Sequence, residues 1–273
     1  MEIVTIIFIL LYMLSATGYF TYLFLQKDYL QKTGFFILLA GFLLHTAIIA
    51  FGFISTGHFP AHNLQETLMV AGWAIAGVFL IIQYKFNLKI LGAFASPLIV
   101  LIVIVASLLP GEPVQTTNIF KSFWLISHII IIFIGEASFA LACVVGILYL
   151  MQERAIKIKI HGFFYRRLPS LELLDTTGYA CIVVGFTMLT IGLITGLVYA
   201  KSVWGRFWSW DPKEVWSAIT WLLYAALLHE RLAVGWRGRK AAIMAIVGFA
   251  VLLFTFFGVN FLLEGHHGVF TKF

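Results

Sequence analysis

Three tryptophans and two carboxylates crowd into a short break between two long apolar runs. The segment reads Trp204-Gly205-Arg206-Phe207-Trp208-Ser209-Trp210-Asp211-Pro212-Lys213-Glu214. Aromatic rings combined with a few fixed polar groups are typical of a ligand pocket, whereas a lipid-facing helix carries few polar groups. The segment therefore predicts a docking site for a large, flat, apolar ligand. An interfacial aromatic belt is the competing interpretation, because tryptophan favours the headgroup zone of membrane proteins.

The end of this segment has the pattern of a helix start. Asp211 can act as the N-cap, Pro212 suits the first helical position, and Glu214 can reach back to the cap. Because a residue before proline avoids the α region, any helix over 202–210 must break at Asp211. We therefore expect a short interfacial helix that is rich in tryptophan, with Trp204, Trp208 and Asp211 on one face.

Histidines near the same side are the residues that could hold a metal in such a ligand. His128 lies about one turn inside an apolar run, and His266 and His267 follow the last run. Two neutral imidazoles give a low-spin, coordinatively closed haem iron, which suits a protein that carries or presents haem. A polar helix contact for His128 and a solvated tail for His266 and His267 are the alternatives.

Two further histidines lie deeper in the apolar runs. His229 is roughly 25 Å below Asp211 along a helix, so it cannot share one haem with His128. It is either a second, separate ligand or a residue of the inner belt beside charged neighbours. His45 lies near the middle of another run, roughly 15 Å deeper than His229, so packing is favoured over ligation there.

Glu136 is a carboxylate two helical turns below His128 at a similar azimuth. A carboxylate at that depth is costly, which suggests a role in polarising a histidine or tuning the site, although a neutral packing residue is an equal alternative. The two cysteines, Cys143 and Cys181, have apolar neighbours and suit buried packing. The chain has no Cys-x-x-Cys-His motif, so it is not expected to attach haem to itself.

Composition defines the elements that must position these residues. Over 273 residues the chain is 62% hydrophobic and 11% charged, and its mean hydropathy is +1.00. These values exclude an ordinary soluble domain and predict an all-α polytopic membrane protein. We expect one integral-membrane domain over 1–273, in which residues 202–216 form the tryptophan segment. Eight spans are predicted, at 3–25, 34–55, 67–84, 90–109, 123–151, 174–200, 212–230 and 241–262.

Lysine and arginine are concentrated in alternate connections. They cluster at 27–32, 85–89, 154–167 and 231–240. The positive-inside rule then predicts that both termini and the tryptophan segment face outward. The net charge of +6 is accordingly a topology signal and gives no reason to expect nucleic acid as a partner. The basic stretch 152–173 is expected to lie on anionic membrane lipid.

A family resemblance agrees with the haem interpretation. Trp204-Gly205-x-x-Trp208-x-Trp210-Asp211 resembles the WWD signature of the haem-handling proteins of cytochrome c biogenesis, which include the CcmC, CcmF and CcsA (ResC) families. The continuation from Asp211 through Trp216 and on to His229 is similar to CcsA in particular. Supporting similarities fall at 57–66, 235–239 and 257–260, so the likeness covers most of the chain.

The resemblance implies particular ligands and partners. In CcsA-like proteins one outer ligand lies early in the fifth span and one in a Gly-x-His stretch after the last, which correspond to His128 and His267. The doubled histidine leaves His266 as a substitute. The family's intramembrane ligand corresponds to His229, and its missing inner partner implies a ResB-like (CcsB) subunit.

The same resemblance implies the haem-presenting half of a System II cytochrome c synthase. Such a protein takes haem b from the inner side and presents it outside for attachment to an apocytochrome c. Whether this chain itself counts as an enzyme is left open. A CcmC-like delivery protein, a b-type cytochrome in quinol electron transfer and a transporter without haem are the alternatives. The expected location is the bacterial cytoplasmic membrane, or the thylakoid membrane if the chain is plastid-encoded.

Overall fold

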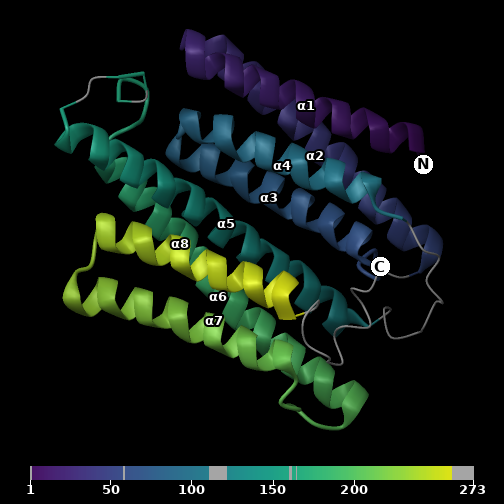
Figure 1. Cartoon of the computed structure of the whole chain (residues 1–273). Helices are drawn as coiled ribbons and strands as arrows, with labels where there is room; N and C mark the ends of the chain where they lie inside the picture. Colours follow the sequence, from purple (N-terminus) through teal and green to yellow (C-terminus); the bar gives the residue numbers. More distant parts are fainter. Residues whose placement is uncertain (1, 58, 111–121, 160–161, 164, 260–273) are drawn as a thin grey trace.

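The computed structural model describes residues 2–57, 59–110, 122–159, 162–163 and 165–259. This part of the chain is helical and contains no strand. The long helices lie side by side as a bundle (Figure 1). They are α1 (Glu2–Leu25), α2 (Asp28–Thr56), α3 (Leu64–Phe86), α4 (Gly92–Leu108), α5 (Phe123–Lys157), α6 (Leu171–Trp204), α7 (Pro212–His229) and α8 (Arg239–Leu253). Short helical turns follow α7 at Glu230–Val234 and α8 at Phe254–Gly258, and Lys89–Leu91 precedes α4.

Helix α5 is the centre of the bundle. It packs most extensively on α6 and also contacts α8 and α3, while α1 packs on α2 and α4 (Figure 1). Helix α7 packs on α6 and α8 at the periphery. One main cluster of buried apolar side chains runs through these helices. The site described below lies where the helices that surround α5 meet at one end.

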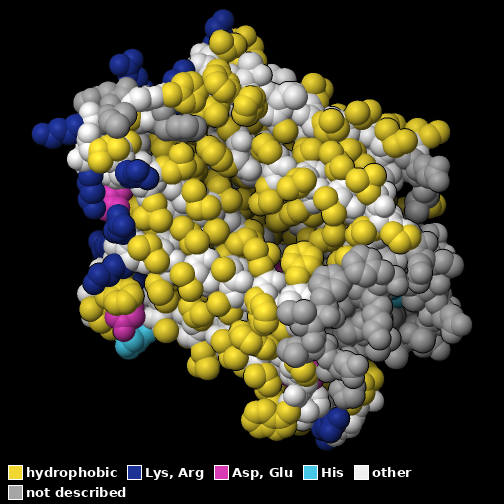
Figure 2. Space-filling view, in the orientation of Figure 1, with side chains coloured by type: hydrophobic (Ala, Val, Ile, Leu, Met, Phe, Trp, Pro, Cys, Tyr) yellow, Lys and Arg dark blue, Asp and Glu magenta, His cyan; other side chains and the backbone are white. Residues whose placement is uncertain are grey.

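The prediction of a multi-span membrane protein is confirmed. Seven of the described helices are long and apolar enough to cross a membrane. The eighth, α7, is an 18-residue helix that carries Lys213 and Glu214 in its first turn, which lowers its hydropathy. Large apolar side chains cover the outside of the bundle (Figure 2), for example Ile54 and Leu108, which are 78% and 79% exposed. Such a surface is suited to lipid rather than water.

Basic side chains gather at the end of the bundle that carries the α5–α6 and α7–α8 connections (Figure 2). The start of α1 and the α6–α7 connection are both at the opposite end of the bundle, on different sides of it (Figure 1). This arrangement is compatible with the charge pattern of the sequence. The assignment of the two ends to the two sides of a membrane remains a prediction.

The connection between α6 and α7 differs from the expected interfacial helix. Helix α6 continues through Trp204 and ends at Gly205, whose φ of +72° is left-handed. Residues 205–211 are irregular, and we call them the 205–211 loop. Glycine adopts this conformation without steric cost and so ends the helix, which the spacing of the tryptophans alone did not reveal. Trp204 and Trp208 therefore do not share a helical face.

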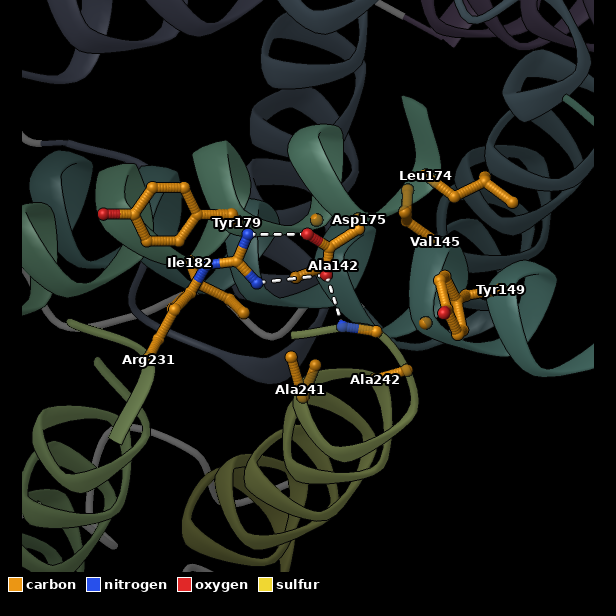
Figure 3. A pocket seen from close by; sticks show the side chains of 14 residues that line it. Ala142, Val145, Tyr149, Leu174, Asp175, Tyr179, Ile182, Arg231, Ala241 and Ala242 are labelled. Atoms are coloured by element: carbon orange, nitrogen blue, oxygen red, sulfur yellow. Dashed lines mark hydrogen bonds and ion pairs between the residues drawn. The ribbon is translucent and has the colours of Figure 1, made fainter. Parts of the chain in front are cut away.

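Asp175 fixes the opposite end of the bundle. Its carboxylate accepts two hydrogen bonds from Arg231, at 2.7 and 3.0 Å, and one from the Gly238 N–H at 2.7 Å (Figure 3). Arg231 also lies over the ring of Tyr179, 4.2 Å from its centroid. These contacts tie the α7–α8 connection to α6. The small cavity beside them has a volume of only about 20 Å³.

The Asp175→Ala variant is expected to lose stability by about 3 kcal/mol, because it leaves the Arg231 guanidinium largely buried and uncompensated. The thermal unfolding midpoint in detergent, followed by circular dichroism, measures this loss. Asp28→Ala is the matched control, since Asp28 pairs with Lys89 at a side chain that is 62% exposed. Equal midpoints for the two variants would show that the Asp175 contacts do not hold this end.

Candidate functional site

A cavity of about 240 Å³ lies at the end of the bundle where α5 begins and α6 ends. We call it the His128 cavity. The 205–211 loop, the first turns of α3 and α7 and the turn after α8 complete its walls. Its lining is mainly apolar, with a few polar side chains, as is usual for small-molecule sites. Those that bear on its chemistry are His128, Glu136, Gly196, Trp204, Phe207, Trp208, Lys213, Glu214 and Ser217.

The ring of His128 is held in one orientation by the backbone of α6. Its Nδ1 lies 2.7 Å from the carbonyl oxygen of Gly192. A carbonyl oxygen can only accept, so Nδ1 carries the proton. In this tautomer of the neutral ring the lone pair is on Nε2, where it can bind iron. The donor chemistry of this histidine therefore fits a haem ligand.

Two glycines of α6 allow α5 to pack closely, and one of them makes room for the His128 ring. A Cβ atom at Gly196 would lie 2.8 Å from Cε1 and 3.0 Å from Nδ1 of His128. A Cβ at Gly192 would lie 2.4 Å from the side chain of Ile132. The absence of side chains here lets α5 approach α6 and gives the histidine its place. Glycines at this spacing in an apolar run were a signal that the sequence reasoning did not use.

Trp204 and Trp208 both line the cavity, as expected of an aromatic floor. Trp210 does not line it: its side chain is 78% exposed, and its ring meets that of Trp208 edge-on at 5.9 Å. Its backbone has a φ of +60°, which is costly for a residue with a side chain. Phe207, which sequence reasoning did not single out, lines the cavity instead.

Glu214 anchors the 205–211 loop. Its carboxylate accepts hydrogen bonds from the Ser209 N–H at 2.8 Å, the Ser209 hydroxyl at 3.0 Å and the Asp211 N–H at 3.3 Å. Asp211 is 5% exposed and accepts from the Lys213 N–H at 2.9 Å, so the predicted capping box is formed. The bonds on either side of Trp210 hold its left-handed backbone in place. Gly205 and Asp211 therefore act as positioning residues at the two ends of the loop.

The Glu214→Ala variant is expected to release the loop while leaving the bundle folded. Three hydrogen bonds to a carboxylate are removed, each worth about 1.5–3 kcal/mol. Limited proteolysis should cleave the variant within 205–211 at least about tenfold faster than the wild type. Glu172→Ala, which removes a carboxylate from the first turn of α6, is the control. Cleavage at wild-type rate would contradict the anchoring role.

Besides Glu214, which anchors the loop, two charged side chains line the mainly apolar walls of the cavity. Glu136 comes from α5 and Lys213 from the first turn of α7. The sequence placed Glu136 beneath His128, and both line this cavity. Lys213 was missed as a cavity residue, because a lysine in the first turn of a helix reads as solvated. Only the packing of α7 against its neighbours turns it inward.

Among the described residues, the other predicted haem ligands do not line this cavity. His45 is 2% exposed, stacks on Phe8 at 4.2 Å and lies 3.3 Å from the Tyr12 hydroxyl, so it packs between α1 and α2. His229 is exposed at the last residue of α7, at the far end of the bundle. His266 and His267 lie outside the described residues. A second axial ligand at the His128 cavity is thus a prediction.

Comparison with known proteins identifies the family. Residues 61–267, which include every residue discussed at the cavity, match the model of the family described as "Cytochrome C assembly protein". The chain belongs to the cytochrome c assembly protein family. The predicted membership of this family is therefore confirmed over most of the chain.

Within the cytochrome c assembly family, the chain is of the CcsA type. It is 36% identical to the cytochrome c biogenesis protein CcsA of Guillardia theta over 241 residues, which is 81% of this chain and 80% of that protein. It is 35% identical to CcsA of Prochlorococcus marinus (strain MIT 9215) over 267 residues, 88% of this chain and 86% of the relative.

A solved structure shares the fold. The cytochrome c haem lyase CcmF superposes with a TM-score of 0.64 at 15% identity. The match covers 98% of this chain and 48% of the CcmF chain, so this chain spans about half of that protein. At this identity the match supports the helical architecture of the cytochrome c assembly family and nothing finer.

Proposed function

We propose that this chain binds haem b in the His128 cavity and presents it to an apocytochrome c. Nε2 of His128 is the axial ligand, and Trp204 and Trp208 support the porphyrin plane. The observation that carries this proposal is the fixed tautomer of His128 at the wall of an aromatic cavity. The CcsA relatives, described as cytochrome c biogenesis proteins, give the reaction context.

In this proposal haem is the substrate, and the protein holds haem in the orientation that the reaction needs. Each thiol of a Cys-x-x-Cys-His segment adds across a haem vinyl group: sulfur bonds to one carbon and the thiol hydrogen ends on the other. The addition is balanced and needs no external oxidant. The cavity would hold haem for attack by the thiols and keep water from the iron. His267, or His266 beside it, supplies the second axial ligand, which the apocytochrome histidine then displaces.

Delivery of haem from the other side of the membrane is assigned to His229, acting with a ResB-like (CcsB) subunit. The distance along α7 between the two ends requires two successive binding sites rather than one. The end with the 205–211 loop faces the periplasm of a bacterial cytoplasmic membrane, or the thylakoid lumen in a plastid. System II is the corresponding assembly pathway.

The test is purification of the chain in detergent, alone and with a co-expressed ResB-like subunit, followed by reduced-minus-oxidised absorption spectra. A low-spin haem spectrum supports the haem site. Adding a peptide with Cys-x-x-Cys-His should convert the bound haem to a form that resists acid-acetone extraction, while a Ser-x-x-Ser-His peptide should not. If haem binds but is never attached, the protein is a delivery protein of the CcmC kind. If no haem copurifies with the complex, the proposal fails.

A further inference from the structure

Lys213 has an unusual setting for a lysine. Its side chain lines an apolar cavity, and it makes no hydrogen bond or ion pair within 4 Å to another residue in the described ranges. Glu136 on α5 lines the same cavity and is likewise without such a contact among these residues. Glu136 and Asp211 act on the lysine charge only at longer range. A charge removed from water is costly unless it is paired closely. Lys213 therefore has no close counter-ion among the described residues.

The backbone around Lys213 does not use this charge. The Lys213 N–H donates to the Asp211 carboxylate, and Glu214 bonds to Ser209 and Asp211, so the capping box is complete without the ammonium group. The lysine side chain is therefore not required to start α7. Because its side chain lines the cavity, the structure indicates that the ammonium group contacts a ligand bound there.

The cavity offers two recognition points on different helices. His128 on α5 can bind a metal, and Lys213 on α7 can bind an anion, with Trp204 and Trp208 on the wall between α6 and the loop. Haem b carries its only negative charges on two propionates at one edge of the ring. A ligand bound to His128 through its iron can therefore turn that edge toward Lys213.

We infer that Lys213 binds a propionate carboxylate of haem, while Glu136 and Asp211 are the more distant carboxylates around its ammonium group. This inference rests on the proposed function. A close ion pair in an apolar cavity stabilises the complex more than the longer-range attraction to Glu136 does. It also fixes the rotation of haem in its plane. The propionate edge faces the start of α7, and the vinyl half is left for the thiols.

The experiment compares the binding of haem and of haem dimethyl ester, in which both propionates are uncharged, to haem-free protein in detergent. Wild type should prefer free-acid haem by about tenfold. Lys213→Gln should lose this preference and Lys213→Arg should keep it. Arg206→Gln is the matched control, because it removes an exposed positive charge from the adjacent 205–211 loop, outside the cavity lining. It should keep the wild-type preference.

The ratio of the two affinities separates this inference from the proposed function. His128→Ala should weaken both compounds and leave the ratio unchanged, because iron ligation is common to both. If Lys213→Gln keeps the wild-type ratio, or weakens both compounds equally, Lys213 does not bind a propionate. If wild type binds neither compound, the haem site itself is wrong and this inference falls with it. Unfolding midpoints confirm that each variant is folded.

Discussion

The His128→Ala variant is expected to lose most of the haem that copurifies with the wild-type chain. The change removes the imidazole, whose Nε2 carries the lone pair because Nδ1 donates to the Gly192 carbonyl. Changing a residue that merely supports a metal ligand costs about 10–100-fold in affinity, so removing the ligand should cost at least that much. The reduced-minus-oxidised absorption spectrum of the purified protein measures the effect.

Added imidazole should restore part of the His128→Ala spectrum, because the truncated side chain leaves space beside the iron. His45→Gln is the control: His45 lies in the membrane too, but it packs on Phe8 between α1 and α2. It should retain its haem. A wild-type spectrum for His128→Ala would exclude this histidine as a ligand and return the tryptophans to the role of an interfacial belt.

The Gly196→Ala variant is expected to have nearly as large an effect on haem without touching any ligand. The new methyl group would lie 2.8 Å from the His128 ring, closer than a Cβ can come, so the ring must move. Moving the ring breaks the 2.7 Å hydrogen bond to Gly192, so Nδ1 is no longer held as the protonated nitrogen. We expect haem content to fall by about tenfold or more, as for other changes that misorient a ligand.

The control for Gly196→Ala is Gly178→Ala on the same helix. A Cβ at Gly178 would meet Val145 at 3.5 Å, which is ordinary contact, so haem content should not change. Both variants should unfold near the wild-type midpoint, since alanine suits a helix better than glycine. If Gly196→Ala binds haem normally, the ring of His128 has freedom that this structure does not show.

Local features of the sequence were sufficient for the class of the protein and the positions of its helices. Apolar run length predicted the membrane spans, and the Asp211-Pro212-Lys213-Glu214 pattern predicted the start of α7 and its capping box, which the structure confirms. Both depend on neighbouring residues only. Helical periodicity was likewise enough to place Glu136 beneath His128 on one wall. The prediction that His128 is a haem ligand needed the family resemblance in addition to its place just inside a span.

Tertiary structure decided which side chains share the site. Trp210 turns outward because Gly205 ends α6 and Glu214 holds the loop with Trp210 at positive φ. Phe207, although 54% exposed, lines the cavity in its place, which helical spacing could not show. The tautomer of His128 depends on a carbonyl 64 residues away, and the room for its ring depends on Gly196. Lys213 becomes a cavity residue only when α7 packs beside α6 and α8. Such contacts join residues distant in the chain, so no local pattern encodes them.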